Sequence, residues 1–409
     1  MLRLGCLRAS VFGGVKPQQR THMGLTLGRY FPTSAQDYLY GGALSDSHAE
    51  YSTEASVADS MRRCKEYTPP ASAAWREEDQ AAISVASFNL LAPCYKRLQG
   101  QRNYMGRTLR ESHAEEAWRG RADDTLQFLK THVLGAETGQ QEGHSIIALQ
   151  EFWLEPAYRQ LFQAAFAEAG YATHALRRGE KKRDSVAVLY RSDQFDLQAS
   201  REVHLVADDR VALLLHLHHK PSGRAVVVVS THLTFPHSLF DRQLQLKQVT
   251  ALAAALGSFS EQQRLGDDVV SIVAGDFNVE GKSPVCQFLR SRGFVASFDV
   301  GGPANNSAAA AADGGPDWVS HRSHLDEELG CDHIFVRRPR TQGAAQGAEE
   351  KQQQLEQQRL RQATGPDHIY IGNNAVVPAS QACGKWDPTF TISDHRPVST
   401  RLYFSRKQP

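Results

Sequence analysis

The 409-residue chain has few cysteines and almost no charge imbalance, and these shortages exclude several classes of protein. Lys and Arg number 46 against 45 Asp and Glu, so a surface coated in basic residues for gripping long nucleic acid is not expected, although one local basic groove is compatible with this balance. The six cysteines form no C-x-x-C pair, which argues against a disulfide framework or zinc cage and favours a reducing compartment. Because no run of 18 apolar residues occurs, we expect no membrane-spanning helix and no membrane partner.

Acidic residues are also absent from residues 1–36, which contain several Arg and Ser residues. An Arg-rich, acid-free N-terminus is typical of an organellar transit peptide. We interpret residues 1–36 as such a peptide, with a mitochondrial address favoured over a chloroplast one. A tail without a targeting role, and hence a cytoplasmic protein, is the alternative.

The rest of the chain divides by composition. Residues 37–79 lack hydrophobic periodicity and include the pair Pro69-Pro70, which predicts a linker of low order. Strand and helix patterns begin near Ile83, so a single domain is predicted over residues 80–405. Two low-complexity segments, 301–316 and 339–368, are predicted to be surface insertions in this domain.

Within the domain, short Val- and Ile-rich runs alternate with helical patterns. Runs such as "SIIAL" (145–149) and "AVVVVSTH" (225–232) predict buried strands. Apolar residues at three- and four-residue spacing predict helices, one over 113–134 and another with Pro156 near its start and Gly170 after its end. Strands interleaved with hairpins and helices predict a layered α/β fold in which two mixed or antiparallel sheets pack together.

Polar residues recur where the predicted strands end or begin. "VVSIVAGDFNVEG" (269–281) places an acid and an amide at the tip of a run that reads as a buried strand. In antiparallel sheets the ends of some strands and the starts of others share one edge, so we expect these polar residues to meet at one rim. They are Asn89, Glu151, His232, Asp276, Asn278, Asp332, Asp394 and His395.

Each of these residues has a structural explanation when taken singly. Asn89 and Asp394 are suited to turns, and Glu151 to the start of the following helix. A divalent cation explains the whole set better, because Mg²⁺ prefers one or two carboxylates together with waters and a substrate phosphate. The sequence therefore predicts a Mg²⁺ site at the rim, with Mn²⁺ as a substitute.

Six motifs occur in a fixed order: "FNLLAP", "ALQEFW", "STHL", "AGDFN", "CDHIF" and "SDHRPV". They resemble the endonuclease/exonuclease/phosphatase superfamily, which has the fold of pancreatic deoxyribonuclease, and the resemblance covers roughly residues 80 to 405. It implies a four-layer α/β sandwich of two mixed, mostly antiparallel sheets packed face to face, with helices outside. "ISVASFNLLAPCYKRL" and "LQEFW" resemble the deadenylase and nocturnin branch most, in particular its plant and algal members.

The resemblance also implies roles for the rim residues. Glu151 would be the principal Mg²⁺ ligand, with Asn89 and Asp394 beside the metal. Asp276 would orient or deprotonate the attacking water, and Asn278 would hold that water or a phosphate oxygen.

The remaining three residues would act on the phosphate. His232 and His395 would contact it, and Asp332 would pair with His395. A carboxylate partner favours the imidazolium, which stabilises the negative charge of the transition state. The expected reaction is in-line displacement by water at phosphorus, with the metal polarising a phosphoryl oxygen.

The expected enzyme is a Mg²⁺-dependent phosphoesterase, in first place a 3′–5′ exonuclease on single-stranded RNA 3′ ends. The alternative substrate is a small phosphorylated nucleotide such as NADP(H), and no obligate protein partner is evident. A non-catalytic module is disfavoured because the set of polar residues is intact. The basic run "RRGEKKRD" (177–184) is a candidate for steering phosphates or a solvated loop, and Glu327-Glu328 stand where a base-stacking aromatic of the branch is expected.

Overall fold

The computed structural model describes residues 80–135, 143–206, 209–266, 269–299, 318–323, 325–337, 369–376, 386 and 390–405. All of these belong to one compact unit, Ser52–Pro409, and a second unit, Met1–Tyr51, lies outside the described residues. The predicted transit peptide, linker and two insertions also lie outside them, so their boundaries and the organellar address stay predictions.

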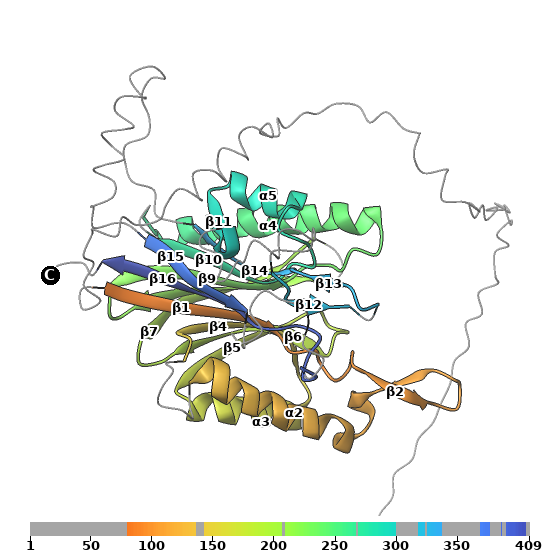
Figure 1. Ribbon diagram of the computed structural model, residues 1–409. Helices are drawn as coiled ribbons and strands as arrows, with labels where there is room; N and C mark the ends of the chain where they lie inside the picture. Colours follow the sequence, from red (N-terminus) through yellow and green to blue (C-terminus); the bar gives the residue numbers. More distant parts are fainter. Residues whose placement is uncertain are drawn as a thin grey trace, which may run out of the picture. The chain divides into compact units, whose positions relative to one another are not determined.

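The described residues form two six-stranded sheets (Figure 1). The first sheet has the order β15-β16-β1-β4-β6-β5, with β1 (Gln80–Asn89), β4 (Ile146–Trp153), β5 (Tyr171–Arg177), β6 (Asp184–Arg191), β15 (Ile369–Val376) and β16 (Val398–Ser405). The second has the order β11-β14-β10-β9-β8-β7, with β7 (Phe195–His204), β8 (Val211–His219), β9 (Arg224–His232), β10 (Val270–Asp276), β11 (Phe294–Ala296) and β14 (Asp332–Arg337).

Both sheets are mixed and mostly antiparallel, as predicted. In the first, β1 pairs parallel with β4 and antiparallel with β16. In the second, β10 pairs parallel with β9 and antiparallel with β14. The carboxyl ends of β1, β9 and β10 therefore lie at the same rim as the starts of β14 and β16.

Helices cover the outer face of each sheet and complete a four-layer sandwich (Figure 1). The helices α2 (Glu115–Leu129) and α3 (Pro156–Glu168) pack on the first sheet, and α4 (Leu239–Gln262) and α5 (Pro284–Ser291) on the second. A π-helical turn, Lys130–Leu134, extends α2 and accounts for the longer helix expected over 113–134.

Burial on both faces explains the unbroken Val runs of the central strands. Along β9, Val226 and Val228 face the core between the sheets, whereas Val227 and Val229 face α4 and α5. All four side chains have no exposed surface. Strands buried on both faces read as continuous apolar runs rather than alternating ones.

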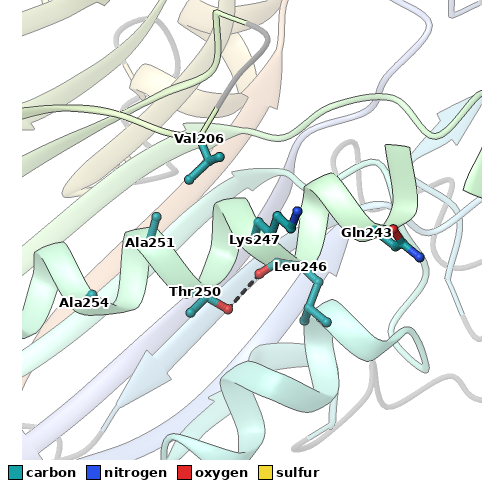
Figure 2. A pocket seen from close by; sticks show the side chains of 7 residues that line it. All are labelled: Val206, Gln243, Leu246, Lys247, Thr250, Ala251 and Ala254. Carbon is teal, nitrogen blue, oxygen red and sulfur yellow. Dashed lines mark hydrogen bonds between the residues drawn. The ribbon is translucent and has the colours of Figure 1, made fainter. Parts of the chain in front are cut away.

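Short elements complete the described chain. They are β2 (Arg97–Arg102), β3 (Thr108–Arg110), β12 (His321–Arg322), β13 (Glu328–Leu329) and the 3₁₀ turns Glu111–His113 and Ser297–Asp299. No helix within the described ranges is both long and apolar enough to cross a membrane. A shallow groove of about 570 Å³ lies along α4, and none of the predicted site residues lines it (Figure 2).

Candidate active site

Asp276, at the end of β10, is the centre of the site. Its register partners are His232 on β9 and Asp332 on β14, so three of the predicted residues lie side by side across three strands. The Nε2 atom of His232 lies 3.4 Å from Oδ2 of Asp276. Asp276 is only 1% exposed. Gly275 precedes it because any side chain there would collide with the Thr231 carbonyl of the neighbouring strand.

Asn278 orients Asp276 through its backbone. The chain leaves the extended conformation here, with φ of 54° at Asn278, and the Asn278 N–H donates to Oδ1 of Asp276 at 2.9 Å. The Asn278 side chain donates to the Leu233 carbonyl at 3.0 Å, while Phe277 is fully buried against α4 and α5. Asp276 is thus held by a turn rather than by simple strand alternation.

Asn89 connects the first sheet to this centre. Its Nδ2 donates to Oδ2 of Asp276 at 3.0 Å, although the two residues lie in different sheets. Its Oδ1 accepts the Leu91 N–H at 3.0 Å, so Asn89 also caps the turn that follows β1. Asn89 therefore has the turn-capping role, and its role beside a metal stays a prediction.

Glu151 lies within a strand rather than at its end. β4 continues to Trp153, past the expected end at Gln150-Glu151, and its pairing with β6 shifts register between Leu149 and Phe152. At this β-bulge Glu151 has φ of 54°, and bulges re-aim side chains next to active sites. One Glu151 oxygen accepts the Ala92 N–H at 3.0 Å.

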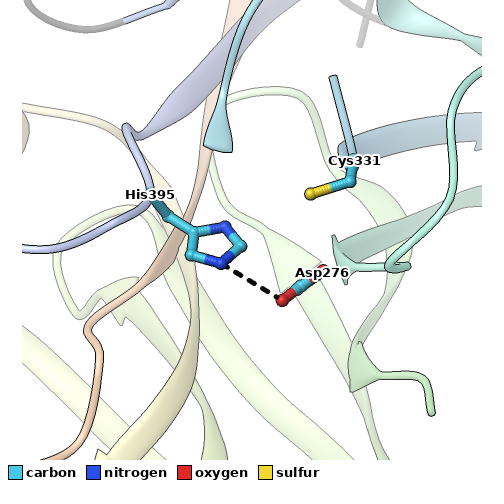
Figure 3. A group of neighbouring side chains, drawn as sticks. All are labelled: Asp276, Cys331 and His395. Atoms are coloured by element: carbon cyan, nitrogen blue, oxygen red, sulfur yellow. Dashed lines mark ion pairs between the residues drawn. The ribbon is translucent and has the colours of Figure 1, made fainter. Parts of the chain in front are cut away.

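His395 joins the last motif to the centre. Its Nδ1 lies 2.8 Å from Oδ2 of Asp332, the pair that the resemblance implied, and its Nε2 lies 3.6 Å from Oδ2 of Asp276 (Figure 3). Burial alone would lower the pKa of His395, but the charges of Asp332 and Asp276 outweigh burial and raise it well above the usual value. His395 is therefore an imidazolium between two carboxylates.

His232 and Asp276, which lie beside His395, do not carry its positive charge. Burial, together with the nearby cations Arg210, Arg178 and Lys182, lowers the pKa of His232 well below its usual value, so this imidazole is neutral. Burial raises the pKa of Asp276 to about 6, against the opposing effect of His395.

Serines missing from the predicted set hold the site together. Ser320 donates to Oδ2 of Asp332 at 2.7 Å and accepts the Asp332 N–H. Ser393 donates to the Asn89 carbonyl at 2.7 Å and accepts the His395 N–H. Ser393 has a sequence signal, since it opens the "SDHRPV" motif, whereas Ser320 lies outside every motif and only the fold brings it here.

A third imidazole, His321, was also missed. Its ring lies 4.1 Å from that of His395, centroid to centroid, and its Nδ1 donates to the Asp394 carbonyl at 3.0 Å. Burial and the positive charge of His395 lower the pKa of His321 to about 4, so it is neutral. No sequence pattern marks this residue.

The basic run at 177–184 is not simply a solvated or steering loop. Arg178 and Asp184 are buried and form an ion pair with an Nε–Oδ2 distance of 2.7 Å. The Tyr95 hydroxyl donates to the same carboxylate at 2.7 Å. Burial and the charge of Asp184 raise the pKa of Glu151 to about 7, so this pair belongs to the wall beside Glu151.

The carboxylates of Glu151 and Asp394 fit a divalent cation. Asp394 raises the pKa of Glu151, which shows that their negative charges repel, and Oδ1 of Asp394 is buried without a hydrogen-bond partner in the described part of the chain. A cation would relieve both conditions, and oxygen ligands suit Mg²⁺. Asp276, Cys331 and His395 also lie close together (Figure 3), but burial raises the pKa of the Cys331 thiol well above its usual value and His395 is protonated. As long as Cys331 and His395 keep their protons, this trio offers a metal only the Asp276 carboxylate.

The sequence is similar to that of known proteins. The model of the Endonuclease/Exonuclease/phosphatase family matches residues 86–395. An uncharacterized calcium-binding protein of Arabidopsis thaliana is 30% identical over 272 residues, which are 64% of this chain and 52% of the relative. The chain thus spans about half of that relative's length.

Solved structures share the fold. The human nocturnin catalytic domain, solved with a bound sulfate anion, has a TM-score of 0.50 and 18% identity, over 80% of this chain and 97% of the solved domain. ANGEL2, a 2′,3′-cyclic phosphatase solved with adenosine-2′,3′-vanadate, has a TM-score of 0.50 and 16% identity, over 80% and 96% of the two chains. The family match covers every residue from Asn89 to His395 that the site brings together, and the chain belongs to the endonuclease/exonuclease/phosphatase family.

Proposed function

We propose that this protein is a metal-dependent phosphoesterase that removes nucleotides from the 3′ end of single-stranded RNA. The observation that carries the proposal is the Asp276 centre, in which a buried carboxylate lies beside a neutral and a charged imidazole. The charged imidazole, His395, is in turn near Asp394, and the charges of His395 and Asp394 both act on Glu151. This combination offers a proton acceptor, a cation for a phosphoryl oxygen and an oxygen site for a metal. Each of the three lowers the barrier to hydrolysis at phosphorus.

The chain's own residues supply the acid–base chemistry. Asp276, with its pKa raised to about 6, is ionised at neutral pH and basic enough to accept a proton from the attacking water. The N–H groups of Asn89 and Asn278 hold its carboxylate in place. His395, kept protonated by Asp332, places a positive charge where negative charge develops on the phosphoryl oxygens.

Glu151, Asp394 and the Oδ1 atom of Asn89 would hold Mg²⁺, or Mn²⁺ in its place. When bound, the ion supplies Lewis-acid polarisation of a phosphoryl oxygen. The remaining contacts of the three residues leave this possible, because Glu151 and Asn89 each accept only one backbone N–H in the described part of the chain.

Two features favour a nucleotide polymer as the substrate. Arg210 and Lys182, whose charges lower the pKa of His232, provide positive charge near this imidazole, whereas the charge of Arg178 is partly offset by Asp184. Phe235, three residues beyond His232, is 39% exposed and offers a ring to a base. Glu327 and Glu328 do not favour poly(A), because they replace a base-stacking aromatic and their charge repels phosphates. Glu328 has a structural role, since it accepts the backbone N–H of Trp386 at 2.9 Å. We therefore expect weak base preference.

Replacing Glu151 tests whether the activity depends on a bound metal. Glu151→Gln removes a charge with little change in volume, so the fold should survive while kcat for RNA falls by at least about a hundredfold. Thermal unfolding of both proteins checks the fold, and Tm titration with Mg²⁺ should show stabilisation of the wild type only. Full activity of Glu151→Gln, or activity that resists a chelator, would contradict the mechanism.

The substrate is tested against a small phosphate ester. NADP(H) is the second candidate, because the same site would accept a 2′-phosphate. We expect kcat/KM for a short single-stranded RNA to exceed that for NADPH and to fall steeply as salt rises, since a polyanion displaces counterions and a single phosphate does not. Efficient cleavage of NADPH with no cleavage of RNA would replace the nuclease assignment by the phosphatase one.

A further inference from the structure

The hairpin formed by β2 and β3 stands away from the sandwich (Figure 1). Its turn is fixed by Asn103, whose Oδ1 accepts the N–H of Met105 at 3.0 Å and that of Arg107 at 2.9 Å. Gly106 has φ of 75°, which the turn requires and glycine accommodates readily. A two-stranded ribbon with such a turn presents its tip in a defined conformation.

The hairpin is strongly basic in a protein with a net charge of only +1. Residues 96–110 read "KRLQGQRNYMGRTLR", with five Lys or Arg residues and no acid. Arg97, Arg102 and Arg107 are exposed, and none of them forms an ion pair with a carboxylate of the described residues. One role of charge on an edge strand is to prevent edge-to-edge aggregation. That role needs no aromatic residue.

An aromatic residue lies at the tip. Tyr104 is 96% exposed and Met105 is 60% exposed, so neither contributes to the core. Aromatic rings among basic residues are the usual composition of surfaces that bind single-stranded nucleic acid, where the ring stacks on a base and the cations follow the phosphates.

The base of the hairpin is joined to the catalytic rim. Ala92, before the hairpin, donates its N–H to Glu151, and the Tyr95 hydroxyl donates to Asp184 in the wall beside Glu151. The Arg110 side chain closes the base by donating to the Tyr95 carbonyl. A ribbon of this length extends roughly 20 Å from the rim, which is enough for several nucleotides.

We propose that the β2–β3 hairpin binds the single-stranded RNA upstream of the 3′ end that occupies the catalytic centre. Arg97, Arg102 and Arg107 contact its phosphates, and Tyr104 stacks on a base. The inference rests on the proposed function, because it names the surface that receives the rest of the same substrate.

Binding of a labelled 12-nucleotide RNA to full-length Glu151→Gln protein tests the proposal without cleavage. Replacing Arg97, Arg102 and Arg107 by Gln should weaken binding tenfold or more and reduce the slope of log K against log salt by about 2, since each phosphate contact on a single strand contributes about 0.7. Tyr104→Ala should weaken binding about tenfold, within the range of one lost stacking contact.

A matched variant removes the same charge elsewhere. Lys247, Arg264 and Arg292 are exposed and lie on α4 or directly after α4 and α5, which cover the second sheet, whereas the hairpin follows β1 of the first sheet. Their replacement by Gln should therefore leave the salt slope unchanged. In otherwise wild-type protein, the hairpin variant should keep its kcat/KM for a dinucleotide, which is too short to reach the hairpin.

Three results would overturn the inference. They are an unchanged salt slope in the hairpin variant, an equal loss in the matched variant, or loss of binding to phosphatidylserine vesicles with RNA binding intact, which would make a membrane surface the partner. Failure of the proposed function would give a different result, because the wild-type protein would then cleave neither the 12-nucleotide RNA nor the dinucleotide.

Discussion

The charge state of His395 depends on a single buried neighbour. Asp332 has no exposed surface, and its Oδ2 receives both the Ser320 hydroxyl at 2.7 Å and Nδ1 of His395 at 2.8 Å. A buried imidazolium without such a partner would lose its proton, because desolvation disfavours the charged form. His395 and Asp332 should therefore act as one unit.

A double-mutant cycle tests this unit. Asp332→Asn and His395→Gln should each lower kcat by about a hundredfold or more, and the double variant should be little worse than either one. Ser393→Ala serves as a comparison, because it removes a bond to the His395 backbone without touching the ring. Losses that multiply in the double variant would mean that the two residues act separately.

At the scale of elements, one ion pair ties together the loops that deliver the site. Arg121 on α2 donates to the carbonyls of Leu90 and Leu91, just after β1, and to that of Ile392, just before Asp394. Its partner Glu111 lies 2.6 Å away, and their side chains are 12% and 7% exposed. The pair therefore fixes the loop after Asn89 against the loop that carries His395.

Arg121→Met should destabilise the fold and misplace both loops. Breaking a buried pair leaves one charge without its partner and typically costs about 3–5 kcal/mol, so the free energy of unfolding should fall by that order. Denaturant unfolding and kcat/KM measure the two effects. The paired change Glu111→Gln with Arg121→Met should recover part of the stability but not the activity, and equal stability of the single and paired variants would argue against the clamp.

Among the strands, the sequence predicted best those that are buried on both faces. The Leu-rich β8 and the Val-rich β9 and β10 stand out, whereas β7 ("FDLQASREVH") alternates buried and exposed residues at a sheet edge and was overlooked. The bulge at Glu151 could not be foreseen, because it arises from the pairing of β4 with β6. Ser320 and His321 escaped for a related reason: their partners Asp332, Asp394 and His395 are defined only by the fold.

At the scale of the whole molecule, buried neutral histidines connect stability to pH. Burial, and the charge of His218, lower the pKa of His219 to about 4, and its Nδ1 shares a 2.8 Å hydrogen bond with Ser222. The unfolded chain has an ordinary His pKa near 6.5, so between pH 6.5 and 4 it binds a proton that the folded chain does not. This contribution to stability is present above pH 6.5 and lost as pH falls toward 4.

The raised pKa values of Asp276 and Glu151 have the opposite effect on stability, because these carboxyl groups bind protons more readily in the folded chain than in the unfolded one. The prediction therefore compares a His219 variant with the wild type. The free energy of unfolding of His219→Gln should fall less steeply than that of the wild type from pH 6.5 to 4, by up to about 1.4 kcal/mol per pH unit. Denaturant unfolding at several pH values measures the slopes. The exposed His237, changed to Gln, should reproduce the wild-type slope, and parallel curves for His219→Gln would contradict the assignment.

The pairing of β1 with β16 determines when activity can appear during synthesis. Gln80 at the start of the first described strand pairs with Ser405 at the end of the last, and Asp394 and His395 lie just before β16. Because Asn89 and Glu151 precede His395 by more than 200 residues, a ribosome releases them well before this imidazole. Under the proposed function, a growing chain that has already built most of both sheets still cannot cleave RNA. Under the same proposal, each nascent chain gains its activity only after the segment that carries Asp394 and His395 has been made and β16 has paired with β1.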